Sequence, residues 1–312
     1  MWRCDVTEDD LLNEVSVRYG LPCAKIELIR HNENITYCID NKYLLRVHKS
    51  KSGFNTTWRY EGADIIKIHE EELKFIEHLK DRGMNVQSPI RNVENNLVTV
   101  LKDGTPATML TWLSGRTVNK NDLTEDFGFE LGVMIGKMHA AAKGYQADSF
   151  LNYNQDMCRR LIELISSYSE NEKIDKKYYR TMSATLEIIG DKLKQSESEH
   201  ILVHSDLSLS NILITENGLV PIDFSLLGYS NPLLDFGSVY SFVADEKCKI
   251  STIKAYEEFR GYKVNRREID YYFALQILLG IVLHHDIWRN EEWFAKRLPE
   301  WCDEIFNPLA DK

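Results

Sequence analysis

One short segment in the second half of the chain combines residue types that can act together on a phosphoryl group. It carries His204, Asp206 and Asn211 close together, and Asp223 follows 12 residues later. A carboxylate can take a proton from a hydroxyl, and an amide oxygen beside a second carboxylate suits Mg²⁺ when water and phosphate supply the other ligands. A metal, a proton acceptor and a hydroxyl placed in line are what phosphoryl transfer requires. The segment therefore predicts a phosphotransferase site with Asp206 as the base.

The chain between Asn211 and Asp223 predicts the turn that brings those two side chains together. Asn217-Gly218 lies between two apolar runs, which is the strongest short-range signal of a β-hairpin. If these two residues form the loop, pairing outward from it places Ile212 opposite Asp223. Cross-strand partners lie about 4.5–5.5 Å apart at Cα. We therefore expect Asn211 and Asp223 side by side.

These residues resemble the catalytic segment of a known family. His204-x-Asp206-x-x-x-x-Asn211, followed by Asp223-Phe224-Ser225, is similar to the catalytic loop and metal-binding turn of the aminoglycoside phosphotransferase and choline kinase family, whose members are relatives of protein kinases. The run His-Ser-Asp-Leu-Ser-Leu-Ser-Asn-Ile-Leu is close to that family's His-Gly-Asp-Leu-His-x-x-Asn-Ile-Leu. The resemblance implies that Asp206 is the catalytic base, that Asn211 and Asp223 bind Mg²⁺, and that His204 supports the loop.

A further aspartate follows this segment. Asp235, within Pro232-Leu233-Leu234-Asp235-Phe236-Gly237, resembles the family's second aspartate, which braces the catalytic loop from the next helix. A helix N-cap or an acid in the first helical turn is the other interpretation, and both can hold together.

The first half of the chain contains candidates for nucleotide binding. Tyr43-Leu44-Leu45-Arg46-Val47 resembles the strand that carries the phosphate-binding lysine of kinases, with Arg46 in the place of lysine. Arginine can also contact phosphate oxygens, with a different geometry. Glu72 lies on the apolar stripe of the helix predicted over residues 64–80, and a carboxylate buried there needs a charged partner, which Arg46 supplies. Glu70 and Glu71 are alternatives that we expect to be solvated.

Two further stretches are placed by position alone. The segment Arg30–Tyr37 occupies the place of the nucleotide-covering loop but lacks the glycines of that loop, so main-chain groups and Asn32 or Asn34 are the expected phosphate contacts. Residues 109–113, which include Thr111 and Leu113, are the expected hinge, whose backbone reads the edge of adenine.

The order of strand-like and helix-like patterns predicts a β-rich lobe followed by an α-rich lobe, and the family resemblance implies that this α+β chain has a protein-kinase-like two-lobed fold. Strand patterns over residues 35–39, 43–47, 97–100 and 108–113 surround one main helix, and from Thr124, the expected N-cap of a helix, the pattern is mostly helical. We expect a small β-rich N-terminal lobe with one main helix at residues 1–108, a hinge at 109–113 and a larger helical catalytic and substrate-binding lobe at 114–312.

Composition restricts the environment and the partners. The six cysteines are scattered without a CxxC pair, which argues against zinc and disulfides and favours a cytoplasmic location. We expect no signal peptide and no membrane span, and read the apolar run Ala274–Leu283 as a buried helix. The net charge of −10 disfavours nucleic acid as a partner. Residues 113–312 hold 31 acidic and 23 basic side chains, which fits either a solvated acidic surface or a cationic substrate.

Other motifs favour structural interpretations. A hydrolase built on His204 and the neighbouring serines lacks the Gly-x-Ser-x-Gly elbow. His284-His285-Asp286 lacks the i, i+4 spacing of a zinc helix. The aromatic residues of the last helices suit core packing better than a cage for a quaternary amine, although the cage would fit a choline-like ligand; they are Tyr271, Tyr272, Trp288, Trp293 and Trp301.

The leading functional hypothesis is an Mg²⁺-dependent kinase that uses ATP or GTP to phosphorylate a hydroxyl of a small molecule of the aminoglycoside, choline or homoserine type. The alternatives are a protein serine/threonine kinase of the bacterial stress-response type and a nucleotide-binding pseudokinase. Ser208 stands where many protein kinases have a lysine, and no Ala-Pro-Glu follows, which argues against the first alternative. The intact set of Asp206, Asn211 and Asp223 argues against the second.

Overall fold

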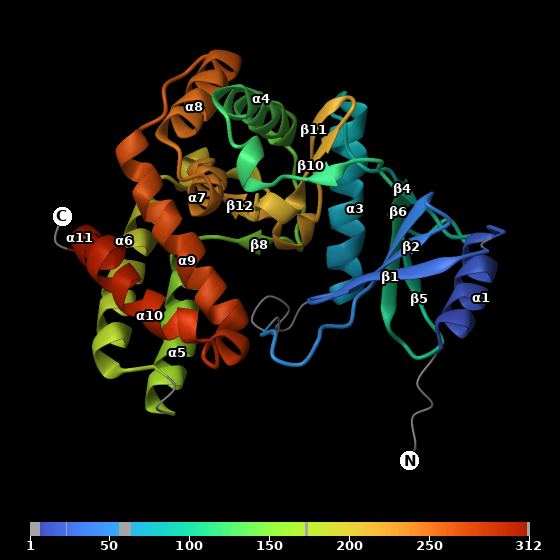
Figure 1. Ribbon diagram of the computed structural model, residues 1–312, viewed down its shortest axis with the longest axis horizontal. Helices are drawn as coiled ribbons and strands as arrows, with labels where there is room; N and C mark the ends of the chain where they lie inside the picture. The colour runs from blue at the N-terminus through green and yellow to red at the C-terminus, as the bar shows by residue number, and fades with distance from the viewer. Residues whose placement is uncertain (1–6, 23, 56–63, 172–173, 311–312) are drawn as a thin grey trace. The chain divides into compact units, whose positions relative to one another are not determined.

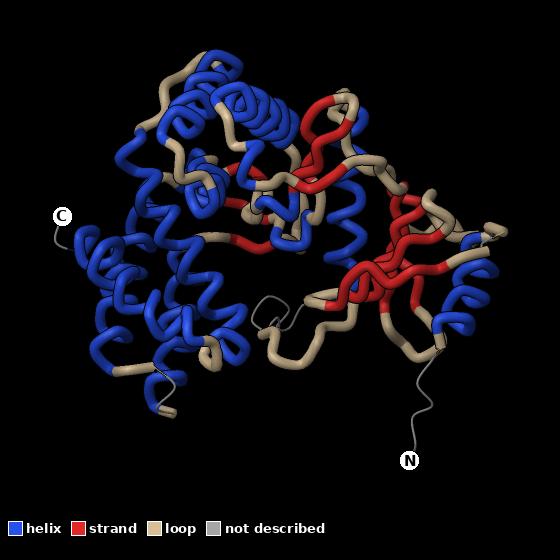
Figure 2. Tube along the Cα trace, in the orientation of Figure 1, coloured by secondary structure: helices blue, strands red, loops and turns tan. Residues whose placement is uncertain are grey.

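The computed structural model describes residues 7–22, 24–55, 64–171 and 174–310. The chain divides into two compact units, Met1–Ser114 and Gly115–Lys312. Figure 1 and Figure 2 show that the first unit is built on one β-sheet and that the second is mainly helical. This confirms the predicted α+β class.

The first unit holds one antiparallel sheet. Its strands pair in the order β1-β2-β3-β6-β4, and β5 also pairs with β6. The predicted hairpin of residues 35–39 and 43–47 is β2 and β3. The described elements are α1 (Glu8–Tyr19), β1 (Ile26–His31), β2 (Ile35–Ile39), β3 (Tyr43–Val47), α3 (Ile65–Asp81), β4 (Pro89–Ile90), β5 (Val98–Val100) and β6 (Pro106–Thr111).

Two helices cover opposite faces of this sheet. Leu11 and Val15 of α1 pack in one apolar cluster with Leu45 of β3. Neighbouring residues of a strand point to opposite faces, so Arg46 points the other way, where its guanidinium contacts Glu72 of α3. The sequence predicts only one main helix here, and α1 corrects that expectation. Its buried stripe consists of only Leu11, Val15 and Tyr19, at i, i+4 and i+8, which is a short helical pattern that sequence reasoning passed over.

The second unit holds most of the described helices and two three-stranded sheets, β11-β10-β7 and β8-β12-β9. In order, its described α-helices and strands are β7 (Arg116–Thr117), α4 (Glu125–Ala142), β8 (Leu151–Asn152), α5 (Gln155–Glu170), α6 (Lys176–Gln195), β9 (Ile201–Val203), β10 (Ile212–Thr215), β11 (Gly218–Pro221), β12 (Gly228–Ser230), α7 (Leu233–Phe242), α8 (Glu246–Arg260), α9 (Arg266–Trp288), α10 (Glu292–Trp301) and α11 (Asn307–Ala310). Single 3₁₀ turns at Leu209–Asn211 and Phe224–Leu226 flank the β10–β11 hairpin.

Helix pairs build the core of the second unit: α4 packs on α8, α5 on α6, and α7 on α9. Thr124 caps α4 as predicted, because its side chain accepts a hydrogen bond from the Phe127 N–H. Glycines allow α4 to approach α8 closely. A Cβ on Gly132 would lie 2.1 Å from the carbonyl oxygen of Thr252, so no larger residue fits without moving a backbone.

Helix α9 runs through the interior of the second unit. Its Ala274–Leu283 stretch is largely buried, as predicted. Across the described residues, no helix combines the length and apolar character needed to cross a membrane. Four of the cysteines lie in described ranges, at positions 38, 158, 248 and 302, and each is a buried free thiol.

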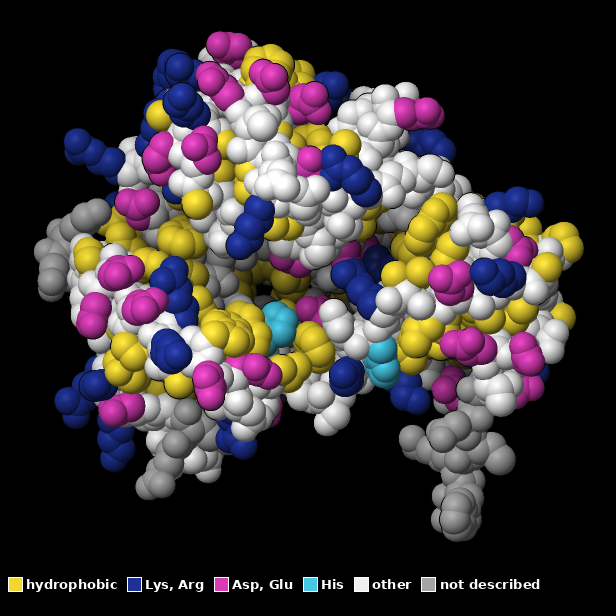
Figure 3. All heavy atoms as spheres, viewed as in Figure 1, with side chains coloured by type: hydrophobic (Ala, Val, Ile, Leu, Met, Phe, Trp, Pro, Cys, Tyr) yellow, Lys and Arg dark blue, Asp and Glu magenta, His cyan; other side chains and the backbone are white. Residues whose placement is uncertain are grey.

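The surface of the helical unit mixes charges of both signs. On the face in view in Figure 3, acidic and basic side chains are interspersed over this unit and do not form one acidic patch. On that face, the excess of acidic residues in the second half is therefore a solvated surface.

Candidate active site

The loop between β9 and β10 places Asp206 and Asn211 in direct contact. The Asn211 side-chain amide donates from Nδ2 to the Asp206 carboxylate at 2.7 Å and to the Asp206 main-chain oxygen at 3.0 Å. Asn211 is 3% exposed, so these bonds are shielded from water. Because a carboxylate and a carbonyl only accept, the amide nitrogen must face Asp206, which leaves the Oδ1 atom of Asn211 as the possible metal ligand.

The β10–β11 hairpin forms as predicted, but with a different loop. Thr215 pairs with Gly218 and Ile212 with Pro221, so the two loop residues are Glu216 and Asn217. The predicted register, with Ile212 opposite Asp223, is therefore wrong by two residues. Gly218 has φ +95 and begins β11, and the Thr215 hydroxyl donates to its carbonyl oxygen at 2.8 Å. This side-chain bond closes the turn one residue earlier than the Asn-Gly signal suggests.

The corrected register still carries Asp223 back to the catalytic loop. The Ile222 N–H donates to the main-chain oxygen of Asn211 at 2.9 Å, so Asp223 follows a residue bonded to Asn211. Asp223 has φ +64, in the left-handed region, and the chain turns there into the 3₁₀ turn Phe224–Leu226. An amide oxygen and a carboxylate at these positions are hard oxygen donors, the type that Mg²⁺ prefers.

The Asn211 amide oxygen and the Asp223 carboxylate would suit a metal ion whose remaining ligands are phosphate and water. Within the described ranges no cluster of three or more His, Cys, Asp or Glu side chains is arranged to hold a metal ion. A pair made of Asn211 and Asp223 is a partial ligand set, of the kind found where Mg²⁺ keeps its waters and binds substrate phosphates.

His204 supports the loop from the inside. Its ring is fully buried, lies 4.6 Å from the Phe224 ring, and donates from Nε2 to the Ile222 carbonyl oxygen at 3.0 Å. Its Nδ1 atom accepts from the Asp206 N–H at 3.3 Å. One ring nitrogen thus faces an acceptor and the other a donor, which selects the neutral imidazole with its proton on Nε2. These contacts are the ones expected of a residue that supports the loop.

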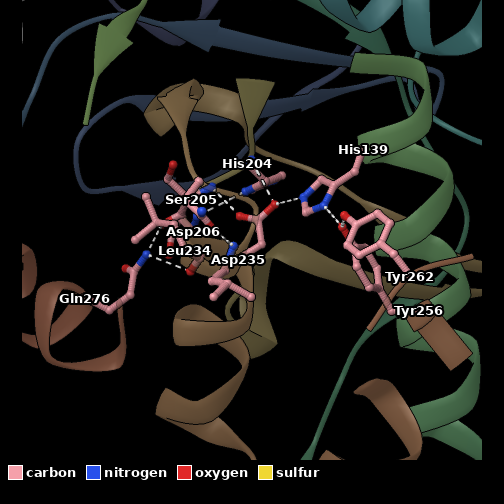
Figure 4. A network of polar contacts seen from close by, with 11 residues as sticks. His139, His204, Ser205, Asp206, Leu234, Asp235, Tyr256, Tyr262 and Gln276 are labelled. Carbon is pink, nitrogen blue, oxygen red and sulfur yellow. Dashed lines mark hydrogen bonds and ion pairs between the residues drawn. The ribbon is translucent and has the colours of Figure 1, made fainter. Parts of the chain in front are cut away.

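Asp235 braces the same loop from the first turn of α7, so both interpretations of this residue hold. It is fully buried, and its carboxylate accepts from the main-chain N–H groups of His204 at 3.1 Å and Ser205 at 2.7 Å. It also accepts from His139 Nε2 at 2.9 Å (Figure 4). Three donors satisfy the buried carboxylate, which would otherwise be costly to bury.

Sequence reasoning missed four residues of this network, which are His139, Tyr256, Tyr262 and Gln276. His139 of α4 joins Asp235 to the Tyr256 hydroxyl at 3.0 Å, and Tyr256 contacts the Tyr262 hydroxyl at 2.8 Å. Burial, with the neighbouring Tyr262, raises the pKa of Tyr256 well above its ordinary value. Gln276 of α9 donates from Nε2 to the Ser205 carbonyl oxygen at 2.8 Å (Figure 4). The only signal available for His139 and Gln276 was a polar residue among apolar neighbours in the second half of α4 and the middle of α9.

In the first unit, the predicted pair of Arg46 and Glu72 is confirmed. Arg46 Nη1 lies 2.7 Å from Glu72 Oε1, and the two residues are 5% and 3% exposed. Burial opposes the charge on Glu72, but the Arg46 charge and the nearby His69 outweigh it and lower the pKa of Glu72 to about 2. Glu71 is also buried, contrary to expectation, and it lies 3.8 Å from Lys67 on the same helix.

Asn34 lies in the turn between β1 and β2, and its side chain is held by a histidine. His48 Nδ1 is 3.0 Å from Asn34 Oδ1, and His48 Nε2 is 3.1 Å from the Thr108 hydroxyl. The His48 ring also stacks on His69 of α3 with 3.5 Å between centroids. The expected nucleotide loop is thus tied to the sheet and to the helix that carries Glu72.

The expected hinge begins inside a strand. Thr111 is the last residue of β6, its N–H donates to the Ser88 carbonyl oxygen at 2.8 Å, and its own carbonyl accepts from Gln87 at 2.9 Å. The next N–H, of Trp112, donates to the Lys42 carbonyl oxygen at 2.7 Å. Other groups of the same chain already bond these main-chain atoms of Thr111 and Trp112. Leu113 is therefore the better candidate for a main-chain contact with the nucleotide base.

The remaining motifs are structural. His285 is buried and stacks on Tyr168, while His284 bonds the Gly280 carbonyl oxygen and stacks on Trp288. The three tryptophans Trp288, Trp293 and Trp301 have ring centroids 5.1–6.4 Å apart, which is direct packing. Trp293 is 44% exposed and Trp288 and Trp301 are half-buried, so the three rings pack on one another at the surface and the expectation that they lie in the core is wrong.

Comparison with known proteins identifies the family of this chain. The pattern of a phosphotransferase enzyme family matches residues 54–271. The amicoumacin kinase of Bacillus subtilis (strain 168) is 24% identical over 230 residues, which are 72% of this chain and 64% of that protein. The match therefore spans less than two thirds of the relative's length.

Solved structures show the same fold. An amicoumacin kinase in complex with AMP-PNP, Ca²⁺ and Ami superposes with a TM-score of 0.72 at 17% identity, over 96% of this chain and 93% of that one. A microcompartment-associated aminopropanol kinase gives 0.70 at 16% identity, over 94% of each chain. The predicted kinase-like fold is confirmed. From the family match, which covers more than half of its residues, the chain belongs to the phosphotransferase enzyme family.

Proposed function

We propose that this protein is an Mg²⁺-dependent kinase that transfers the γ-phosphate of ATP or GTP to a hydroxyl of a small, amine-bearing molecule. The observation that carries the proposal is the direct contact of Asp206 with Asn211. The main chain of Asn211 is also bonded to Ile222, the residue before Asp223. Family membership and a fold shared with two kinases support it. The buried free thiols suit a reducing cytoplasm as its compartment.

In this proposal Asp206 accepts the proton of the attacking hydroxyl. The Asn211 amide holds one carboxylate oxygen through Nδ2 and so fixes the direction in which Asp206 points. Asn211 Oδ1 and Asp223 would hold Mg²⁺, which neutralises charge on the nucleotide phosphates when it is bound. Arg46, oriented by Glu72, is the proposed phosphate contact of the first unit.

The class of acceptor is proposed from the relatives. Two of the matched proteins are named for amicoumacin and aminopropanol. Both names are of amine-bearing compounds, which supports an amine-bearing acceptor for this chain. We therefore propose an amino alcohol or an amino-substituted natural product as the acceptor.

A nucleotide and acceptor screen tests the proposal. The purified chain is incubated with Mg²⁺ and ATP or GTP against aminopropanol, choline, homoserine, methylthioribose and kanamycin, with nucleoside diphosphate release and ³¹P NMR as readouts. We expect release above the rate with water for at least one acceptor, and loss of about 10²–10⁴-fold in kcat for Asp206→Asn. Asp156→Asn, at an exposed aspartate on α5, is the matched control.

Two results would count against the proposal. Nucleotide binding that is indifferent to Mg²⁺, without turnover, would indicate a pseudokinase. Labelling of the protein itself by ATP, lost in Asp206→Asn while every small acceptor fails, would indicate a protein kinase.

A further inference from the structure

The backbone of the catalytic loop is bent at Ser205, directly before the proposed base. Ser205 has φ +65, a left-handed conformation that a residue with a Cβ adopts at an energetic cost, and it is fully buried. Glycine would adopt such a conformation without that cost. In this chain, other contacts must therefore hold the bend.

The peptide group that joins Ser205 to Asp206 is held at both of its ends. Its carbonyl oxygen accepts from Gln276 Nε2 at 2.8 Å, and its N–H, which belongs to Asp206, donates to His204 Nδ1 at 3.3 Å. The C=O and N–H of a trans peptide point in opposite directions within one rigid plane, so the two bonds hold opposite edges of that plane. Rotating that plane would break both bonds and would swing the Asp206 side chain away from Asn211.

Gln276 contacts both aspartate-bearing segments. Its Nε2 atom also lies 3.5 Å from the carbonyl oxygen of Leu234, the residue before Asp235 (Figure 4). Both partners are carbonyl oxygens, which only accept, so the amide nitrogen must be the atom that faces them. Gln276 thus spans the bend at Ser205 and the start of α7, and it comes from a helix distant in sequence.

We propose that Gln276 is a positioning residue that orients the Ser205–Asp206 peptide and thereby aims the Asp206 carboxylate. The proposal rests on the proposed role of Asp206 as base. It states that the hydrogen bond from Gln276 on α9 offsets the energetic cost of the left-handed conformation of Ser205. Misplacement of a catalytic group by about 1 Å can reduce a rate about 100-fold.

Gln276→Met tests the proposal, because methionine has a similar length and volume but no N–H donor. We expect kcat to fall about 10–100-fold while the Kd of the Mg²⁺-nucleotide complex changes less than about twofold. Gln155→Met, which removes an exposed side-chain hydrogen bond on α5, is the matched control and should leave both values unchanged. Equal losses in kcat and nucleotide affinity would indicate a merely structural role and overturn the proposal.

Hydrogen exchange separates this proposal from the proposed function. The Asp206 amide should exchange about 10-fold faster or more in Gln276→Met, while amides of β10 and β11 keep their rates. This readout needs no acceptor, so it holds even if wild-type protein turns over nothing and the kinase assignment fails. Unchanged exchange at Asp206 would overturn the proposal. If the methionine variant does not fold, Gln276→Asn, whose donor is retracted by one methylene, is measured instead.

Discussion

Replacing Glu72 by glutamine removes one charge from the buried ion pair of the first unit. Arg46 and Glu72 are 2.7 Å apart and nearly inaccessible to water. Glutamine keeps the shape of the side chain but leaves the guanidinium charge without its carboxylate. Removal of one partner from a buried pair typically destabilises a protein by about 3–5 kcal/mol.

The pKa of Glu72 gives an independent magnitude and a pH window. Its pKa is about 2 in the folded protein against an ordinary value of 4.5. A shift of this size corresponds to about 3 kcal/mol of stability. Because the folded pKa is the lower one, this contribution is fully present well above pH 4.5 and is lost as the pH falls toward 2. At pH 3.5 about 2 kcal/mol of it should remain.

Urea unfolding of wild-type protein and Glu72→Gln at several pH values between 7 and 3.5 measures this difference. The destabilisation should be about 3 kcal/mol at pH 7 and should shrink by about 1 kcal/mol at pH 3.5. Glu77→Gln is the matched control on the same helix, since the Glu77 pair with Arg91 is partly exposed and is worth about 0–1 kcal/mol. The reasoning is refuted if Glu72→Gln is no more destabilising than this control, or if its effect does not change with pH.

Three further substitutions test separate parts of the molecule. Asp206→Asn should leave the nucleotide Kd within about threefold while turnover is lost, and calorimetry that shows no nucleotide binding would instead indicate a folding role. His48→Phe keeps a ring for stacking but loses the bond to Asn34, so nucleotide affinity should fall about 2–10-fold; an unchanged Kd would place Asn34 outside the nucleotide site. Gly132→Ala should destabilise the protein by about 1–3 kcal/mol in urea unfolding, whereas Gly190→Ala, whose Cβ would meet its nearest neighbour at 3.3 Å, should be close to neutral. Equal effects of the two glycine substitutions would contradict the close packing of α4 on α8.

Local sequence determined the elements that carry the chemistry. The spacing of His204, Asp206 and Asn211 places all three on one loop, because eight residues between two strands cannot separate them far. The apolar stripe of α3 already identified Glu72 as an inward carboxylate that needs a cation. The order of strands and helices predicted a β-rich part followed by a helical part, since each long periodic pattern folds as its own element. The kinase-like fold followed from the resemblance of the catalytic segment to the family.

Tertiary structure alone decided which groups hold that loop in place. Asp235 meets His139 of α4, and Gln276 of α9 meets Ser205, although 96 and 71 residues separate the partners. No spacing rule links residues that far apart, because their contact depends on how whole helices pack. The hairpin register shows the same limit on a smaller scale. The Asn-Gly signal predicted a turn, but the Thr215 hydroxyl bond to Gly218 decided where it closes.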